Sequence, residues 1–226
     1  MSEDLTRRKE TISGSAVVFL LLDISNMDEG LYEDWRKAAS RGRREKAEKF
    51  HRRKDRYLSI GAAHLLDLML REYGMREKER EPSFGKEGKP CYNGLPASFS
   101  LSHSGDCVLL TYSEEVRTIG CDLEKTGAIE ERFVEFCLGR KACEAFRALH
   151  GAEAQAFFFE HWTRLESFLK ADGKGFSRTP PEMDLYVPRT ETLPAGLCPA
   201  GYVGAVCVQN RPLYGSVLAS GKKSLM

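Results

Sequence analysis

The chain has 226 residues, of which 42% are hydrophobic and 30% are charged. This composition is that of an ordinary soluble globular protein, and the length suits one large domain or two small ones with a sizeable core. The formal net charge at pH 7 is only +1. No global electrostatic field therefore favours nucleic acid or a membrane surface as a partner.

The charge is unevenly distributed along the chain. Residues 41–56 contain nine Lys or Arg and three Asp or Glu, so this segment carries six excess positive charges and the rest of the chain is net acidic. The segment can be a solvated helical face, a nucleic-acid patch or a clamp for a polyphosphate. Because few aromatic residues interrupt it, nucleic acid is disfavoured.

Cysteine usage and hydropathy indicate the compartment. The seven cysteines are odd in number and include no CxxC pair, which favours a reducing compartment without disulfides or a structural zinc site. The apolar run at 16–22 is too short to span a membrane and is more typical of a buried strand than of a signal peptide. We expect a cytoplasmic protein without a membrane segment.

The first part of the chain is predicted to form a strand, then helices, then a loop. The stretch "SAVVFLLLDIS" at 15–25 predicts a buried strand. Helical periodicity extends from 28 to about 73 and ends at Gly74, a typical residue just beyond a helix C-terminus. The polar stretch 75–97 is rich in Pro and Gly and predicts a loop.

The remaining chain predicts strands, helices and strands again. Strands are expected at 98–104, 107–113 and 116–125, with a turn at 104–106. Helices are expected at 128–149 and 152–171. The tail predicts strands at 184–187, 201–208 and 213–218. This order indicates an α+β fold, divided into two similar halves at 1–116 and 117–226.

Two carboxylates in the strand "IGCDLEK" suggest a cation site. Asp122 and Glu124 lie two residues apart, so both side chains project from one face of the strand. Adjacent carboxylates repel unless a cation lies between them, and an all-oxygen ligand set suits Mg²⁺. The alternative is a solvent-facing strand with charged residues. No phosphate-binding GxxxxGK[ST] loop, GxGxxG, GxSxG or HExxH motif is present.

The predicted helix at 152–171 carries a second set of polar residues. Trp162, Glu166 and Lys170 recur every four residues and so share one face. Glu166 and Lys170 can form an ordinary surface salt bridge worth about 0.3–0.5 kcal/mol. Alternatively, because Phe158 and Trp162 share the face, it is half-buried and the two charges need other partners.

The stretch "SLSHSGD" at 100–106 places hydroxyls around a histidine. Neighbouring strand residues point to opposite faces, so Ser102 and His103 cannot form a nucleophile and base pair in a regular strand. His103 is either a structural histidine or a phosphate ligand. Basic groups in three segments together with the carboxylate pair suggest an anionic, magnesium-bound substrate such as a pyrophosphate.

Four motifs occur in order: "GKP" at 88–90, "FSLSHS" at 99–104, "IGCDLE" at 119–124 and "WTRLESFLKADGKGF" at 162–176. Together they resemble the 4′-phosphopantetheinyl transferases of the surfactin-synthetase-activating (Sfp) type. The resemblance implies a monomer built as a pseudo-two-fold pair of α+β subdomains, each with an antiparallel sheet, and an active site at their interface. It implies Mg²⁺-dependent (or Mn²⁺-dependent) transfer of phosphopantetheine from coenzyme A to a serine of an apo acyl or peptidyl carrier protein, releasing adenosine 3′,5′-bisphosphate.

The resemblance also implies roles for individual residues. Asp122, Glu124 and Glu166 would bind the metal ion, and Glu166 would deprotonate the serine of the carrier. Lys170 would neutralise charge on the transferred phosphate. The other implied contacts are with coenzyme A: the 3′-phosphate for His103 and Ser102, the nucleotide pocket for Lys89, and further phosphates for Arg43, Lys46 and Arg56.

The sequence departs from the family pattern at two positions. Leu165 replaces the lysine that usually precedes the metal-binding glutamate, and Ser100 replaces an asparagine. The first change puts one supporting cation in doubt. Two alternative functions remain at this stage: a Mg²⁺-dependent nucleotide pyrophosphate hydrolase, and an inactive module that binds coenzyme A or a carrier.

Overall fold

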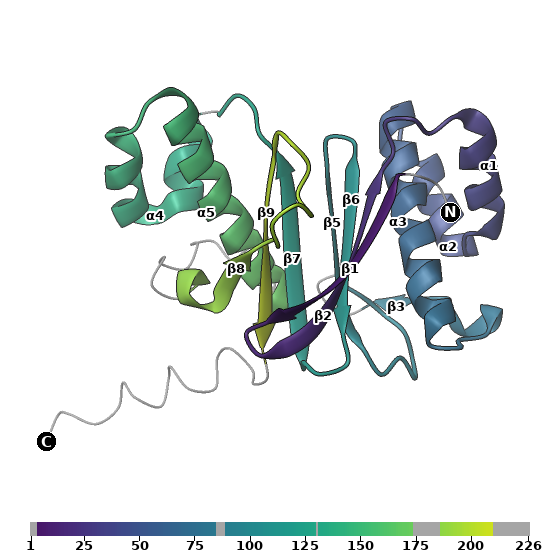
Figure 1. Cartoon of the computed structure of the whole chain (residues 1–226). Helices are drawn as coiled ribbons and strands as arrows, with labels where there is room; N and C mark the ends of the chain where they lie inside the picture. The colour runs from purple at the N-terminus through teal and green to yellow at the C-terminus, as the bar shows by residue number, and fades with distance from the viewer. Residues whose placement is uncertain (1–3, 85–88, 130, 174–185, 210–226) are drawn as a thin grey trace, which may run out of the picture.

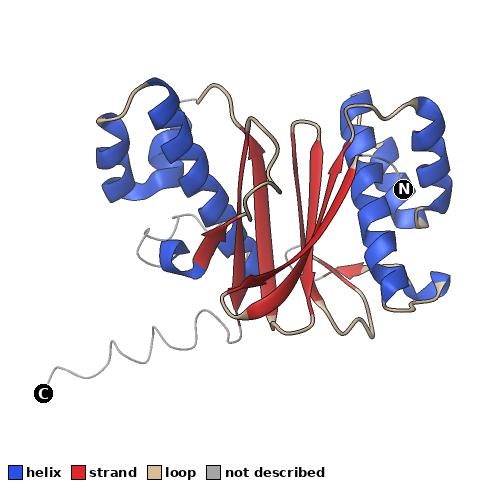
Figure 2. Ribbon diagram, viewed as in Figure 1, coloured by secondary structure: helices blue, strands red, loops and turns tan. Residues whose placement is uncertain are grey.

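The computed structural model describes residues 4–84, 89–129, 131–173 and 186–209. Its architecture is α+β, as predicted: two antiparallel sheets lie at the centre, with α1, α2 and α3 on one side and α4 and α5 on the other (Figures 1 and 2). Among the described residues, none of the helices contains an apolar stretch that could span a bilayer. The boundary at 116 and the pseudo-two-fold relation between the halves stay predictions.

The first sheet contains four strands in the order β1-β2-β6-β5. Strand β1 was not predicted, because its sequence "LTRRKETI" is mostly polar and lies at the exposed edge of the sheet. It joins β2 through a tight hairpin whose two turn residues, Ser13 and Gly14, both have positive φ. The strands have these bounds: β1 Leu5–Ile12, β2 Ser15–Asp23, β5 Ser98–Ser104 and β6 Cys107–Ser113.

The predicted helical region contains three helices: α1 Glu29–Ala38, α2 Arg41–Glu48 and α3 Arg53–Glu72. The carboxylate of Asp28 accepts a hydrogen bond from the backbone N–H of Leu31 and so caps α1. The predicted end of the third helix is confirmed, since Gly74 has φ of 67° just after it. The described part of the predicted loop holds one short turn, η1 (Glu77–Glu79), and the paired strands β3 (Ser83–Phe84) and β4 (Pro90–Cys91).

The second sheet has the order β7-β9-β8. The predicted strand at 184–187 is wrong for its described residues, because a 3₁₀ turn begins at Val187 and the strand follows it. The predicted strand at 213–218 lies outside the described residues. The elements of this half are β7 Thr118–Lys125, α4 Glu131–Arg147, α5 Gly151–Asp172, η2 Val187–Arg189, β8 Thr190–Thr192 and β9 Tyr202–Gln209.

The two sheets pack face to face, so the first sheet is buried on both sides. Along β2, Leu20 and Leu22 point into the core formed with α1 and α3. Phe19 and Leu21 point the other way, into a core shared with Leu123 and other residues of the second sheet. This alternation explains the continuous apolar run of β2, because a strand buried on both faces has no polar side.

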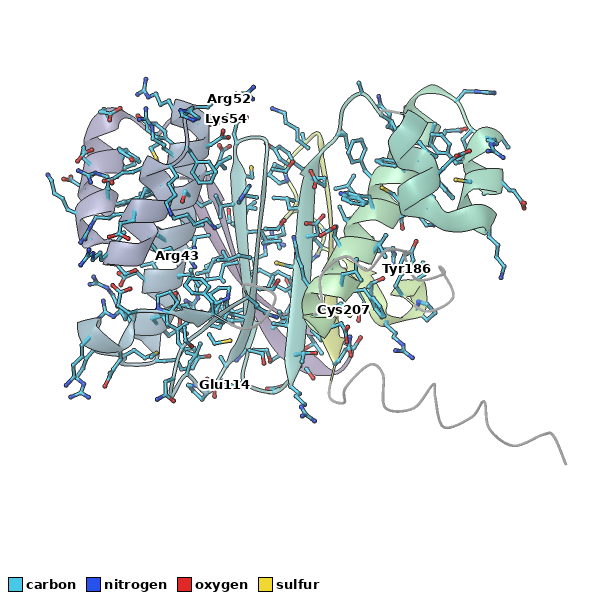
Figure 3. The ribbon with its side chains drawn as sticks, turned by 180° about the vertical axis from the view of Figure 1, so that it is seen from behind. Arg43, Arg52, Lys54, Glu114, Tyr186 and Cys207 are labelled. Atoms are coloured by element: carbon cyan, nitrogen blue, oxygen red, sulfur yellow. The ribbon has the colours of Figure 1, made fainter. Side chains whose placement is uncertain are left out.

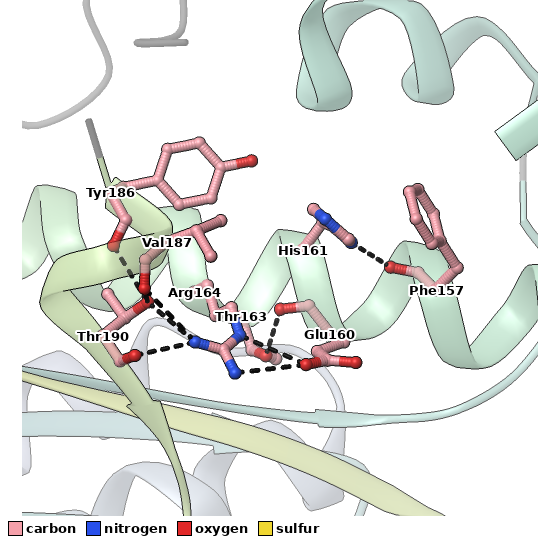
Figure 4. A network of polar contacts seen from close by, with 8 residues as sticks. All are labelled: Phe157, Glu160, His161, Thr163, Arg164, Tyr186, Val187 and Thr190. Carbon is pink, nitrogen blue, oxygen red and sulfur yellow. Dashed lines mark hydrogen bonds and ion pairs between the residues drawn. The ribbon is translucent and has the colours of Figure 1, made fainter. Parts of the chain in front are cut away.

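Helix α5 packs very closely on β7. A Cβ atom at Gly120 would lie 1.9 Å from the backbone oxygen of Ser167, so only glycine allows this approach. Arg164 links α5 to β8. Its guanidinium pairs with Glu160 of the same helix at 3.1 Å and donates to the backbone oxygen of Thr190 at 2.7 Å (Figure 4). The position of α5 against both edges of the second sheet is therefore tightly fixed.

The turn between β5 and β6 also connects the two halves. Asp106 accepts from Lys54 of α3 at 2.6 Å and from Lys125 of β7 at 3.2 Å; Lys54 is labelled in Figure 3. Its backbone N–H donates to the hydroxyl of Tyr202 in β9. Gly105 has φ of 57°, and a Cβ there would collide with that same hydroxyl. The turn is thus held between both halves.

Candidate active site

The polar face of α5 lies along β7. The long side chains of Trp162 and Lys170, eight residues apart on α5, reach the two carboxylates of β7. Trp162 donates from Nε1 to Glu124 Oε1 at 3.3 Å, and Lys170 donates from Nζ to Asp122 Oδ1. Glu166 lies between these two contacts on the same helical face. Trp162, Glu166 and Lys170 of α5 thus line up beside Asp122 and Glu124 of β7. We name these five residues the carboxylate seam.

Asp122 is the most deeply buried member of this seam, with a side chain only 3% exposed. Its Oδ1 accepts from Lys170 Nζ at 2.6 Å and from Ser102 Oγ at 2.7 Å. Burial lowers the pKa of Lys170, but Asp122 with Cys121 and Glu166 outweighs burial and raises it overall. Lys170 is thus held as a cation. No ion pair joins Glu166 to Lys170 among the described residues.

Glu124 and Glu166 are held in an environment that disfavours their charge. Burial raises the pKa of Glu124, and the negative charge of Asp122 raises it further, although Ser104 and Trp162 donate to its two oxygens. Burial also raises the pKa of Glu166; Lys170 opposes this, but Asp122 and Glu124 add to it. Three mutually repelling carboxylates attract a positive charge beyond the one that Lys170 supplies.

The donor set fits a hard divalent cation whose remaining ligands come from substrate and water. Asp122 Oδ2 is buried and has no hydrogen-bond partner among the described residues. Within the same residues, no three His, Cys, Asp or Glu side chains form a preassembled cluster that could hold a metal ion. Mg²⁺ commonly binds through one or two carboxylates together with phosphate oxygens and water, so the arrangement suits it.

A cavity of about 630 Å³ opens beside this seam and receives residues from both halves of the chain. Glu166 and Lys170 line it from α5, and Arg43, which is labelled in Figure 3, lines it from α2. Phe50 and Phe84, the exposed large hydrophobic residues of the described chain, lie on its wall. Its other charged or titratable lining residues are Lys46, Lys49, Asp55, Lys89 and His103. The wall is therefore strongly cationic.

Cations in the cavity repel one another. Desolvation lowers the pKa of His103, and the charges of Lys170 and Lys46 lower it further. Desolvation also lowers the pKa of Lys46, with a contribution from Arg43. An anionic ligand would relieve this repulsion and raise both pKa values. The cavity is thus electrostatically prepared for phosphate groups.

Comparison with known proteins agrees with this geometry. A sequence profile described as the 4′-phosphopantetheinyl transferase superfamily matches residues 118–209, from β7 to β9. The chain is also 30% identical over 137 residues to 4′-phosphopantetheinyl transferase Sfp of Bacillus subtilis, with 60% of each chain aligned. The chain is therefore similar to 4′-phosphopantetheinyl transferases over part of its length.

Further 4′-phosphopantetheinyl transferases show similar partial matches. 4′-Phosphopantetheinyl transferase HetI of Nostoc is 30% identical over 154 residues, covering 65% of this chain and 62% of the relative. 4′-Phosphopantetheinyl transferase AcpT of Salmonella typhimurium is 35% identical over 98 residues, covering 41% and 50% respectively. The chain therefore spans less than two thirds of each of these curated relatives.

The structure brings most of the predicted site residues together. Arg43, Lys46, Lys89 and His103 line the cavity with Glu166 and Lys170. Asp122 and Glu124 lie behind this wall, in contact with residues of α5. Lys89 is anchored there through its Nζ, which donates to the backbone oxygens of Ile119 and Lys170, and burial lowers its pKa.

Three predicted positions lie elsewhere. Arg56 does not line the cavity; its charge acts on Tyr32, where burial raises the pKa of the phenol and Arg36 and Arg56 oppose the rise. Ser102 is buried behind the wall, and its hydroxyl is occupied by Asp122, so contact with a phosphate would require it to give up that bond. Leu165 is fully buried in the core beneath α5, away from the cavity.

Sequence reasoning missed the hydrogen-bonding roles of Trp162 and Ser104. Trp162 donates to Glu124, and Ser104 donates to the same carboxylate at 2.6 Å. It also missed Lys49 and Asp55 as residues of the cavity wall. The signal for Ser104 was visible in the strict alternation of serines at even positions of "SFSLSHS", which places them all on one side of the strand.

Proposed function

We propose that this chain transfers the 4′-phosphopantetheine group of coenzyme A to a serine of an apo carrier protein. The observation that carries this proposal is the pairing of two chemistries in one place. A cationic wall of the 630 Å³ cavity suits the phosphates of a nucleotide, and the adjoining carboxylate seam suits a pyrophosphate-bound cation. The names of the related proteins support the same reaction.

The cationic wall has the charge that coenzyme A requires. His103, Lys46 and Arg43 would contact its phosphates, and Lys89 would line the nucleotide pocket from its anchored position. Because phosphoryl transfer depends mainly on positioning and charge neutralisation, such a wall can contribute a large part of the catalysis. Both walls come from one chain, so the proposal requires no second copy.

Asp122, Glu124 and Glu166 would hold Mg²⁺, which supplies Lewis acidity and orients the pyrophosphate when bound. Glu166 lines the cavity and its pKa is raised, so it is suited to accept the proton of the carrier serine. The serine oxygen forms a bond to the phosphorus that carries pantetheine, and the bond from that phosphorus to the adenosine 3′,5′-bisphosphate leaving group breaks. Lys170 would offset the negative charge that develops there.

The test is intact-mass analysis of several apo carrier proteins after incubation with the protein, Mg²⁺ and coenzyme A. We expect one phosphopantetheine to be added to at least one carrier, with adenosine 3′,5′-bisphosphate as the second product. Breakdown of coenzyme A without any carrier would instead establish a pyrophosphate hydrolase. Binding of coenzyme A without a mass shift on any carrier tested would indicate an inactive binding module.

A further inference from the structure

Serine side chains join the two sheets where their edges meet at the site. Strands β5 and β7 belong to different sheets, yet the hydroxyls of Ser100, Ser102 and Ser104 accept from the backbone N–H groups of β7. Each donor lies 21 residues after the serine that accepts from it. The donors are Cys121 at 3.0 Å, Leu123 at 3.3 Å and Lys125 at 3.0 Å. Each hydroxyl thus replaces the carbonyl that a paired strand would offer. We name these three residues the serine ladder.

Two of these hydroxyls also donate to the carboxylates of the site. Ser102 Oγ lies 2.7 Å from Asp122 Oδ1, and Ser104 Oγ lies 2.6 Å from Glu124 Oε2. A hydroxyl has one proton to donate and two lone pairs to accept with. Ser102 accepts from Leu123 and from Lys170 at 3.1 Å, so all its hydrogen-bonding capacity is used. Its proton is therefore committed to Asp122.

Ser100 differs from the other two members of the ladder. It accepts from the backbone N–H of Cys121 in the same way, but the position of β7 that corresponds to Asp122 and Glu124 is Gly120, which has no side chain to receive a proton. Ser100 therefore connects the strands without holding a proposed metal ligand. The chain itself thus supplies a matched control for the connection between β5 and β7.

We propose that Ser102 and Ser104 are positioning residues for the cation site. Each binds one carboxylate oxygen to β5, which fixes the rotation of the side chain. For Asp122 the opposite oxygen, Oδ2, is the atom left without a partner among the described residues. The ladder thereby orients that oxygen toward a cation before substrate arrives, so no rotamer has to be selected on binding. This inference rests on the proposed function, because it assumes that the cation accompanies coenzyme A.

The experiment compares Ser104→Ala with Ser100→Ala in the full-length chain. Mg²⁺ is titrated calorimetrically into each protein saturated with coenzyme A, and the thermal midpoint is measured without Mg²⁺. Both variants lose one connection between β5 and β7, so we expect each Tm to fall by roughly 2–4 °C. Only Ser104→Ala should also weaken Mg²⁺ binding, by about tenfold, as is usual when the hydrogen-bond partner of a metal ligand is removed.

A threonine substitution at Ser104 distinguishes the effect of the hydroxyl on the carboxylate from the effect of side-chain packing. Ser104→Thr keeps the hydroxyl and should restore Mg²⁺ affinity to within about twofold of the wild type, since threonine is well tolerated in strands. Ser102→Ala should weaken Mg²⁺ binding at least as much as Ser104→Ala, because Lys170 also loses a partner. If Ser102→Ala fails to fold, the Ser104 series alone decides the question.

Equal Mg²⁺ affinities for Ser100→Ala, Ser104→Ala and the wild type would overturn the positioning role. So would an equal weakening in Ser100→Ala and Ser104→Ala, because the effect would then come from the connection between the strands. Transfer to a carrier by the wild type is scored separately by mass. A wild type that transfers while the variants bind Mg²⁺ normally would refute only the ladder's role, whereas a wild type that does not transfer would refute the proposed function.

Discussion

The two sides of the cavity hold charge in opposite ways. On the N-terminal side the cations of α2 are solvent-accessible, and desolvation and mutual repulsion lower the pKa of Lys46. On the C-terminal side Asp122 is 3% exposed, and each of its contacts is a fixed hydrogen bond from β5 or α5. Interactions between exposed charges are screened by salt. A buried charge, in contrast, strongly destabilises the fold when its partner is removed.

This difference predicts that substitutions on the two sides have effects of different kinds. Changes in the cationic wall should alter affinity for the nucleotide in small, salt-dependent steps. Changes in the carboxylate seam should alter the chemistry or the stability of the fold.

The largest effect is expected for Glu166→Gln. Removing the proposed base should lower the transfer rate by roughly 10²–10⁴-fold, while binding of coenzyme A remains measurable because the cationic wall is intact. The rate is measured by carrier mass shift, and binding is measured by calorimetry. Full transfer activity in this variant would refute the assignment of Glu166.

Lys170→Met should destabilise the fold. Asp122 would keep its charge in a buried position without its cation, a change that typically costs 3–5 kcal/mol. Because the side chain of Lys170 is 30% exposed, water can replace part of the interaction, and we expect about 3 kcal/mol. Urea unfolding measures the loss, and Lys49→Met, on the exposed wall of the cavity, is the comparison. Equal losses in the two variants would contradict the contrast between the sides.

Lys46→Ala should weaken binding of coenzyme A by about tenfold, equivalent to ~1.4 kcal/mol. The loss should shrink as salt is raised, and kcat at saturating coenzyme A should change little. Arg56→Ala is the matched control from the same basic segment, because Arg56 does not line the cavity. A comparable loss of affinity in Arg56→Ala would show that the wall extends farther than this arrangement indicates.

The smallest effect concerns stability as a function of pH. The pKa of Glu166 is raised above its ordinary value of 4.5, so its contribution to stability is fully present below that pH and is lost as pH rises through the folded value. Glu166→Gln removes this loss. The variant should therefore be more stable than the wild type at pH 7, by roughly 1 kcal/mol, with little difference at pH 4. A variant less stable than the wild type at pH 7 would show that Lys170 stabilises Glu166 overall.

Local sequence patterns predicted most of the regular structure. The strands at β2, β5, β6, β7 and β9 and the helical regions follow from periodicity and turn residues. Strand β1 could not be predicted, because its polar sequence acquires strand structure only by pairing with β2 at the edge of the sheet. The strand expected at 184–187 is wrong at its described end for the converse reason. Tyr186 is buried and Val187 is partly buried against α5, in a turn rather than a strand.

The composition of the site was also largely visible in the sequence, but its connections were not. The repeat of Trp162, Glu166 and Lys170 and the spacing of Asp122 and Glu124 each define one face of an element. Which faces meet depends on Gly120, whose missing side chain lets α5 approach β7. The assignment of Lys170 to Asp122, and of Arg56 to the surroundings of Tyr32, follows from that packing.

Local periodicity and motifs are enough to indicate the α+β fold class, the resemblance to the superfamily and the residues around which the site is built. The pairing of the charges, and the choice of hydroxyls that hold the carboxylates, depend instead on how the elements pack. Hydrogen bonds between β5, β7 and α5 join residues 20 to 68 positions apart. Such contacts depend on the burial and orientation of whole elements, and no local pattern specifies them.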